Sequence, residues 1–110
     1  MAMGKANIPT SFEQALAEGK PGKLLLRLFI AGFTPRSQAA IIALRQMIEE
    51  RLDGNYLLEI IDIYQQPEMA RQQQILATPT LVKYMPQPKK IMIGDLTRTD
   101  RVLAGLGFAG

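Results

Sequence analysis

Two hydroxyl side chains, Thr34 and Ser37, stand three residues apart directly after an apolar run, where a nucleophile could sit at a helix N-terminus. A hydroxyl nucleophile needs a base to take its proton, and histidine is the commonest base in enzymes. The chain has 110 residues, and none of them is histidine or cysteine. Thiol redox chemistry, thiolate nucleophiles and the usual zinc ligands are therefore excluded as well, and the two hydroxyls are predicted to cap a helix.

The carboxylates do not form an evident catalytic pair. Glu59 and Asp62 lie three residues apart in one predicted strand, so they point to opposite faces of a sheet. Arg27 interrupts another apolar run, and on a neighbouring strand it could pair with Glu59 as a structural ion pair, which contributes little if exposed. Asp62 ends its strand, where it either caps the next turn or belongs to a binding site. We therefore expect no catalytic residue, no cofactor and no metal site, and predict that the chain is not an enzyme.

The positive charge is mild and scattered. The net charge is +3, from 13 basic and 10 acidic residues. Nucleic-acid binders usually gather such charge on one face, so nucleic acid is not an expected partner. Lys83, Lys89 and Lys90 surround a proline-rich turn, and two interpretations are open: a small basic patch, or a solvated turn, which we favour.

The length and hydropathy indicate a single globular domain. A chain of this length has no room for a second core, and 47% of its residues are hydrophobic. No apolar run reaches the roughly 18 residues that span a bilayer, and the N-terminus lacks the apolar core of a secretory signal. We expect no membrane partner and a cytoplasmic location.

The elements that must position these side chains can be predicted from periodicity and turn residues. Thr34 and Pro35 mark the start of a long helix whose apolar residues repeat at three- and four-residue spacing. A strand, crossover helix and strand imply a parallel pair. The order is βαβαββα, predicted at residues 24–30, 35–52, 56–63, 67–74, 80–84, 90–93 and, after a capping box at 97–100, a last helix to residue 106.

The ends of the chain are predicted to be less ordered. Residues 1–22 form an N-terminal extension, partly disordered or holding a short helix after Thr10 or Ser11, and residues 23–110 form the domain. Gly105 and Gly107 are expected to weaken the last helix by about 1 kcal/mol each relative to alanine. Four methionines are predicted to fill gaps in the core rather than to form a binding stripe: Met47, Met69, Met85 and Met92.

Pro79 stands where the third strand begins, a position that costs no hydrogen bond of the sheet. The proline ring pushes Thr78 towards extended geometry. The bond between them is either an ordinary trans bond or a cis bond that turns the chain sharply into the sheet.

Three stretches resemble the KaiB family of circadian clock proteins. Residues 28–37 (Leu-Phe-Ile-Ala-Gly-Phe-Thr-Pro-Arg-Ser) are similar to the family's first strand and its A-G-x-T-P-x-S turn. Residues 75–81 (Ile-Leu-Ala-Thr-Pro-Thr-Leu) look like its proline corner, which is also that of the thioredoxin fold, and residues 93–96 (Ile-Gly-Asp-Leu) resemble its late I-G-D-L. The resemblance runs without gaps from about Lys23 to Phe108.

This resemblance implies an α/β, thioredoxin-like fold, with one alternative. KaiB-like proteins are metamorphic: a resting oligomer keeps the first strand–helix–strand half and rearranges the second, while the partner-binding monomer is thioredoxin-like throughout. Two such packings of one sequence must lie within a few kcal/mol of each other. The positions implied as cis prolines or fold-switch residues are Pro79, Pro86, Pro88, Gly105 and Gly107.

The resemblance also implies a function and partners. KaiB-like proteins are non-enzymatic regulators that bind the ATPase ring of the KaiC kinase, alter its phosphorylation state and change which regulators it recruits, among them KaiA or a clock histidine kinase. A homo-oligomer, tetramer or dimer, is expected. The partner-binding residues carried over to this sequence are Tyr56, Glu59, Asp62, Gln74 and Lys83.

Some positions depart from the family pattern. Ala39 stands where an arginine is common, while Glu59 and Gln74 replace common lysines. The chain therefore looks like a divergent member whose KaiC contact is altered, or which serves another partner. The alternative function is a KaiC-independent, redox-inactive, thioredoxin-like stress adaptor or chaperone-like module.

Overall fold

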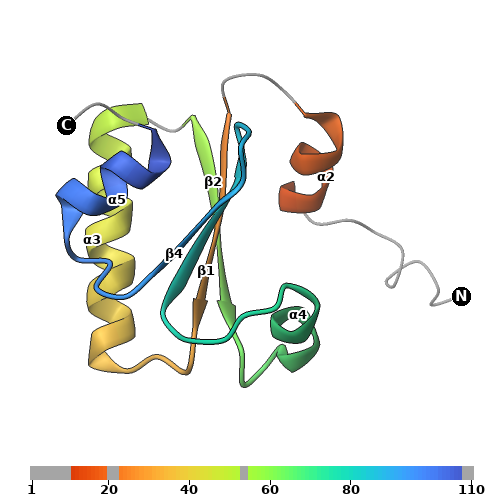
Figure 1. Cartoon of the computed structure of the whole chain (residues 1–110), viewed down its shortest axis with the longest axis vertical. Coiled ribbons are helices and arrows are strands. Elements are labelled where there is room, and N and C mark those ends of the chain that lie inside the picture. The colour runs from red at the N-terminus through yellow and green to blue at the C-terminus, as the bar shows by residue number, and fades with distance from the viewer. Residues whose placement is uncertain (1–10, 20–22, 53–54, 108–110) are drawn as a thin grey trace, which may run out of the picture.

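The computed structural model describes residues 11–19, 23–52 and 55–107, which form one mixed sheet with helices on both faces (Figure 1). The strands lie in the order β2–β1–β3–β4. Their bounds are Leu24–Ile30 for β1, Tyr56–Asp62 for β2, Thr80–Met85 for β3 and Lys90–Ile93 for β4. The helices are α2 (Ser11–Glu18), α3 (Pro35–Leu52), α4 (Pro67–Gln72) and α5 (Thr99–Leu106).

The pairing of the strands is that of a thioredoxin-like sheet. β1 and β2 are parallel, with Leu24 opposite Tyr56 and Ile30 opposite Asp62. β3 runs antiparallel to β1, and β4 runs antiparallel to β3. From β1 onward the order of elements is βαβαββα, so the predicted α/β, thioredoxin-like fold is confirmed. This structure has that arrangement in its second half too, rather than the rearranged alternative.

The sheet separates two hydrophobic cores, because successive strand residues point to opposite faces. The larger core lies between the sheet and α3 and α5. Its central members are Leu26, Leu28, Ile30, Leu44, Ile48 and Leu81. The smaller core lies under α2 and α4. It contains Phe12, Leu25, Phe29, Ile61, Val82 and Tyr84.

Several predictions about the ends of elements need correction. β2 ends one residue early, β3 continues to Met85, and α4 ends at Gln72. The capping box predicted before α5 is wrong: Arg98 is the N-cap and makes no side-chain cap bond. Thr97 instead donates its hydroxyl and amide hydrogens to Asp95, two residues earlier.

Gly107 was predicted to weaken the last helix from inside, and this is wrong as well. It lies after α5 as its C-cap, with a left-handed φ of 94°, and its N–H bonds back to the helix. Glycine adopts that conformation without a steric penalty. Gly105 does lie within α5.

The predicted N-terminal helix is present as α2, where Phe12 is buried in the smaller core. Residues 1–10 and 20–22, which complete the predicted extension, lie outside the described residues. Met47 is buried, and Met69, Met85 and Met92 pack against the two cores, as predicted. The bonds before Pro79, Pro86 and Pro88 are cis. Among the described residues, no helix is both long and apolar enough to cross a membrane.

Candidate partner-binding surface

The turn after β1 is built by hydroxyl capping, as predicted. The Thr34 hydroxyl accepts the Ser37 backbone N–H at 3.1 Å and donates to the Ser37 hydroxyl at 3.2 Å. Thr34 therefore satisfies one of the free amides at the start of α3. In the part of the chain that the structure describes, no group of three or more acidic side chains could hold a metal ion.

Arg27 and Glu59 face each other across β1 and β2, and their predicted ion pair is confirmed. The Arg27 Nε donates to Glu59 Oε1 at 2.7 Å. An ion pair contributes little to stability when both side chains are exposed. Here the Arg27 side chain is only 5% exposed and that of Glu59 28%, so the pair is largely buried. A pair that is largely removed from water depends strongly on both partners.

Two aromatic rings hold the Arg27 guanidinium from its other sides. Its carbon lies 4.3 Å from the centre of the Phe12 ring and 5.3 Å from that of Tyr84. The two rings meet edge to face, with centroids 5.4 Å apart. Burial alone lowers the pKa of Arg27, but the neighbouring Tyr84 and Glu59 outweigh it and hold that pKa above its usual value. α2 is thus docked by one ring onto a buried, permanently charged group.

The other two predicted β2 residues are engaged at opposite ends of the strand. Tyr56 donates its hydroxyl to Glu49 Oε2 on α3 at 3.1 Å, and the pKa of Tyr56 is raised by desolvation and by this bond. Asp62 Oδ1 accepts the backbone N–H of Gly32 at 3.1 Å and that of Tyr64 at 3.0 Å. Asp62 therefore caps the following turn, as predicted, and also ties β2 to the turn after β1.

Lys83 corrects the favoured interpretation of the basic residues. The solvated turn is wrong for this residue, which lies within β3, inside the strand predicted at 80–84, and is only 4% exposed. Its cross-strand neighbours are Leu26 on β1 and Lys90 on β4. Burial and the charge of Lys90 lower the pKa of Lys83. Lys89 lies over the Tyr84 ring at 5.2 Å, so the three lysines do not form one patch.

The five predicted partner-binding residues are therefore dispersed. Tyr56 and Asp62 lie about 20 Å apart along β2, and Glu59 points to the other face of the sheet. Gln74 is exposed just after α4, with a left-handed φ of 57°. Three of the five lie along β2, which is an edge strand, whereas Lys83 lies in β3 and Gln74 beyond α4.

Two exposed aromatic side chains at the carboxyl ends of β1 and β2 were missed from the sequence. Phe33 is 57% exposed and Tyr64 73% exposed. The Tyr64 ring lies against Gly32, where an added Cβ would sit 3.6 Å from ring carbon Cε2. The sequence did place both aromatic residues in predicted turns, and this could have indicated that their side chains are exposed. This end of the sheet is also where open α/β folds commonly bind ligands.

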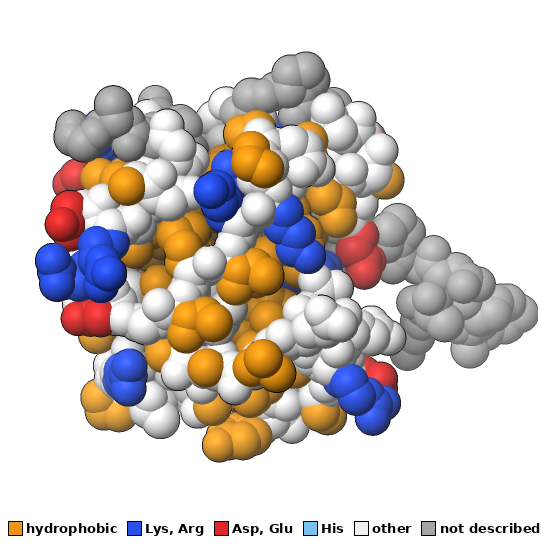
Figure 2. Space-filling model, viewed as in Figure 1, with side chains coloured by type: hydrophobic (Ala, Val, Ile, Leu, Met, Phe, Trp, Pro, Cys, Tyr) orange, Lys and Arg blue, Asp and Glu red, His pale blue; other side chains and the backbone are white. Residues whose placement is uncertain are grey.

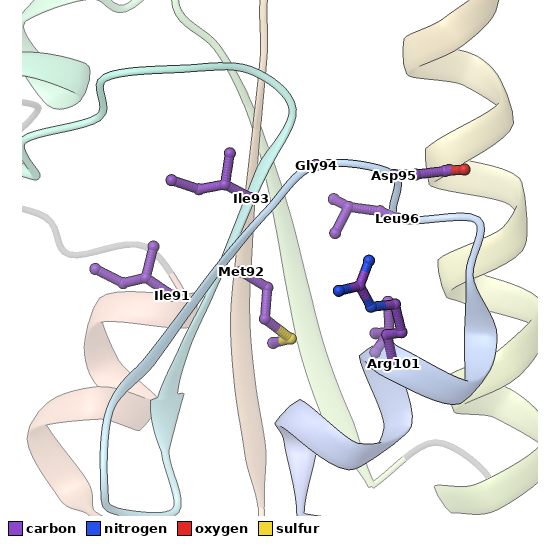
Figure 3. Close-up of a pocket in the computed structure, with 8 residues that line it drawn as sticks. Ile91, Met92, Ile93, Gly94, Asp95, Leu96 and Arg101 are labelled. Carbon is purple, nitrogen blue, oxygen red and sulfur yellow. The ribbon is translucent and has the colours of Figure 1, made fainter.

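Gly105, an implied fold-switch position, is where α5 packs on β4. A Cβ added there would clash with the Met92 sulfur. Beside this contact lies a hollow of about 320 Å³, lined by residues 91–96 and by Arg101 and Val102 (Figure 3). The absence of a side chain at residue 105 thus lets the last helix approach the edge strand closely.

Comparison with known proteins gives one family. The model of the KaiB domain matches residues 27–108. The circadian clock oscillator protein KaiB of Prochlorococcus marinus (strain MIT 9312) is 45% identical over 82 residues, covering 74% of this chain and 78% of the relative. The KaiB of Synechococcus sp. (strain RCC307) is 46% identical and covers 74% of each chain.

Solved structures show the fold. The N-terminal domain of Synechococcus elongatus SasA is 26% identical, with a TM-score of 0.63, covering 76% of this chain and 79% of that domain. Mitochondrial thioredoxin 3 of Saccharomyces cerevisiae is 17% identical, with a TM-score of 0.64 and coverage of 84% and 85%. The second likeness concerns the fold alone.

Proposed function

This chain belongs to the KaiB family, and we propose that it is a non-enzymatic regulator of a circadian clock that acts by binding another clock protein. The observation that carries this proposal is the family match over residues 27–108, with relatives named as clock oscillator proteins at about 45% identity. The capped turn after β1 supports it, because Thr34 and Ser37 bond to each other where a thioredoxin has its reactive thiols. We place its action in the cytoplasm.

The partner we propose is the ATPase ring of KaiC, whose phosphorylation state and recruitment of KaiA or of a clock histidine kinase would change on binding. The surface comprises α3, the β2 edge with Tyr56, Glu59 and Asp62, and α4 with Gln74 beyond it. Lys83 is buried, so we propose that it supports this surface from within the sheet and does not contact the partner directly. Phe33 and Tyr64 add exposed apolar area at the carboxyl end of β2, and exposed aromatic residues are enriched among binding hot spots.

The test is complex formation with an ATP-hydrolysing KaiC ring, followed by size-exclusion chromatography after prolonged incubation. We expect the wild-type chain to elute with the ring and Tyr64→Ala to lose at least tenfold in affinity, the range of a hot-spot residue. Ile91→Ala is the matched control, because Ile91 is comparably exposed but lies on the opposite edge of the sheet. No complex with the wild-type chain after overnight incubation contradicts the proposal.

The second half of the chain is the part we propose to be changeable. Its elements are short, since α4 has six residues, β4 four and α5 eight, against 18 in α3. Pro79, Pro86, Pro88, Gly105 and Gly107 all lie in this half. Amide hydrogen exchange tests the idea: β3 to α5 should open at lower free energy than β1, α3 and β2. Uniform protection across both halves would refute it.

A KaiC-independent adaptor or chaperone-like module is the second candidate. Exposed apolar side chains at Phe33, Tyr64 and Leu76 favour it, because such side chains can hold an unfolded client. Heating an aggregation-prone client enzyme with the protein distinguishes the two. Protection of the client without KaiC binding supports the adaptor, whereas KaiC binding without protection supports the clock role.

A further inference from the structure

Helix α2 is the one described helix that lies outside the family match. The KaiB model begins at residue 27, whereas α2 spans Ser11–Glu18. The helix nevertheless contacts both β1 and β2. It lies on the same side of the sheet as α4 (Figure 1), and α4 belongs to the proposed partner surface. Any role of α2 is therefore an addition of this chain to the KaiB domain.

One side chain anchors α2 to the sheet. Of the eight residues in this helix only Phe12 is buried. Ala15 is partly buried against the smaller core, and Leu16 is 36% exposed. A helix of eight residues is marginal in water without tertiary contacts, so the docking of α2 depends on the burial of Phe12.

The Phe12 anchor lies over a predicted partner-binding residue. Glu59 is on the α2 face of the sheet, because its neighbours on either side in β2 pack against the larger core. The Glu59 carboxylate accepts the Arg27 Nε–H at 2.7 Å, and the Phe12 ring lies 4.3 Å from the Arg27 guanidinium. A hollow of about 250 Å³ remains between Ser11 and Phe12 of α2 and residues 57–59 of β2. The helix thus covers this part of β2 without filling the space against it.

The position of α2 is not that of a general shield for apolar surface. Hydrophobic side chains gather in the middle of the face seen in Figure 2, over the region where Figure 1 shows β4. Ile91 and Ile93 of that strand stay more than half exposed. β4 is the edge of the sheet opposite β2, so α2 covers the edge with the paired polar groups and leaves the apolar edge open.

We propose that α2 is an autoinhibitory cover of the β2 edge. While Phe12 is docked over Arg27, the Glu59 face of β2 is closed to the clock partner, and the partner binds when α2 has left. This inference rests on the function proposed above, because Glu59 belongs to the surface proposed there. A change that loosens α2 then raises the apparent affinity for the partner, since a larger fraction of the chain is competent to bind.

Release of α2 leaves no buried charge without a partner. Arg27 keeps its bond to Glu59 and its contact with the Tyr84 ring at 5.3 Å, so the sheet beneath α2 retains its own polar contacts. The vacated position between the guanidinium and the edge of the Tyr84 ring fits another aromatic side chain. The contact that replaces Phe12 is therefore an aromatic residue of the partner.

The affinity of the full chain for an ATP-hydrolysing KaiC ring tests the cover. Phe12→Ala should bind about tenfold more tightly than the wild type, within the usual range of coupling between two sites. Phe12→Leu keeps part of the buried apolar area and should lie between the two. Leu16→Ala is the matched control on the same helix, and it should bind within about twofold of the wild type. Circular dichroism checks that each variant is folded, and Phe12→Leu carries the comparison if Phe12→Ala does not fold.

Amide hydrogen exchange of the wild-type complex distinguishes a cover from an additional contact. On binding the ring, the amides of α2 should exchange at least about fivefold faster, while those of β2 should exchange more slowly. Slower exchange of α2 in the complex overturns the proposal, because α2 would then belong to the interface. Equal or weaker binding of folded Phe12 variants overturns it as well, although the clock role would stand. A ring that binds neither the wild type nor the variants contradicts the proposed function and the autoinhibition together.

Discussion

The two edges of the sheet differ in what their side chains contact. On β2, Tyr56, Glu59 and Asp62 all bond to other parts of the same chain. On β4, Ile91 and Ile93 are exposed to water, and Lys90 faces another lysine.

Because of this difference, covering the β2 edge and covering the β4 edge would have different energetic consequences. Polar groups already paired within the chain must either keep those bonds or exchange them when a partner binds, so the β2 edge offers specificity more than new affinity. Exposed apolar groups and a like-charge contact both improve when covered. Substitutions at the two edges should therefore act with opposite sign on stability.

Breaking the pair between β1 and β2 has the largest expected effect. Arg27→Ala should lower the free energy of unfolding by about 3 kcal/mol, because it strands the Glu59 carboxylate and removes the stack on Phe12 and Tyr84. Denaturant titration measures this. Arg71→Ala, which breaks an exposed ion pair with Glu68 on α4, is the control and should cost under about 0.5 kcal/mol. Equal losses would show that the buried pair is not special.

Asp62→Ala comes second. Two backbone N–H groups, on Gly32 and Tyr64, lose their acceptor, so the free energy of unfolding should fall by about 2 kcal/mol. Asp62→Asn keeps an oxygen at the same place and should recover at least half of that loss. If asparagine were no better than alanine, the carboxylate charge rather than the two hydrogen bonds would be the stabilising feature.

Much of this could be predicted from the sequence, for local reasons. Thr34 before Pro35 predicted the start of α3, since a cap needs only its own next turn. Arg27 and Glu59 were predicted to be neighbours because each interrupts an apolar strand of one parallel pair. Both predictions depend on periodicity and short-range geometry, which a sequence displays directly.

The failures depend on contacts that lie further apart. Lys83 was grouped with Lys89 and Lys90 around the proline-rich turn, although it belonged to the strand predicted at 80–84, and β3 pairs with both β1 and β4 there. Thr97 was expected to cap α5, but its hydroxyl donates to Asp95 instead. Phe33 and Tyr64 were passed over because side-chain exposure in a loop is decided by what packs beneath it. In each of these cases the tertiary contacts available to the side chain, rather than its local propensity, determined its burial or its hydrogen-bond partner.

Lys83→Met should stabilise the β4 side by about 1 kcal/mol at neutral pH, because it removes a buried charge that faces Lys90 and keeps the side-chain volume. The pKa of Lys83 is lower in the folded chain, so the folded state releases this proton first. The free energy of unfolding of the wild type therefore increases as pH rises through the pKa of Lys83 in the folded chain towards 10.5, its ordinary value. Below the folded-state pKa, Lys83 is charged in both states, and the cost of burying that charge is complete.

The measurement is the free energy of unfolding of Lys83→Met and wild type against pH, at a protein concentration low enough to keep the chain monomeric. The advantage of the variant should shrink as pH approaches 10.5. Lys89→Met is the control, since Lys89 is exposed and should show no such dependence. A destabilised Lys83→Met would mean that the ammonium group makes a favourable contact.

Gly105→Ala tests the packing of α5 against β4 and should change the free energy of unfolding little. Alanine gains about 1 kcal/mol of helix propensity over glycine, but its methyl must displace the Met92 sulfur, so we expect a net change under about 0.5 kcal/mol. In a Met92→Ala background the clash is absent, and Gly105→Ala should stabilise by about 1 kcal/mol. Additive effects across the double-mutant cycle would show that this contact does not limit the helix.

The smallest expected effect returns to the β2 edge, at Tyr56. Its bond to Glu49 is exposed, so Tyr56→Phe should cost only about 0.3 kcal/mol. The bond is better seen in titration: desolvation and Glu49 raise the pKa of Tyr56, and Glu49→Gln should lower that pKa towards its ordinary value of 10.0. Ultraviolet titration of Glu49→Gln, with Tyr64→Phe and Tyr84→Phe in the background, isolates this ring. An unchanged pKa would mean that burial alone sets it, and that the end of β2 is less tied to α3 than its other polar groups are to their partners.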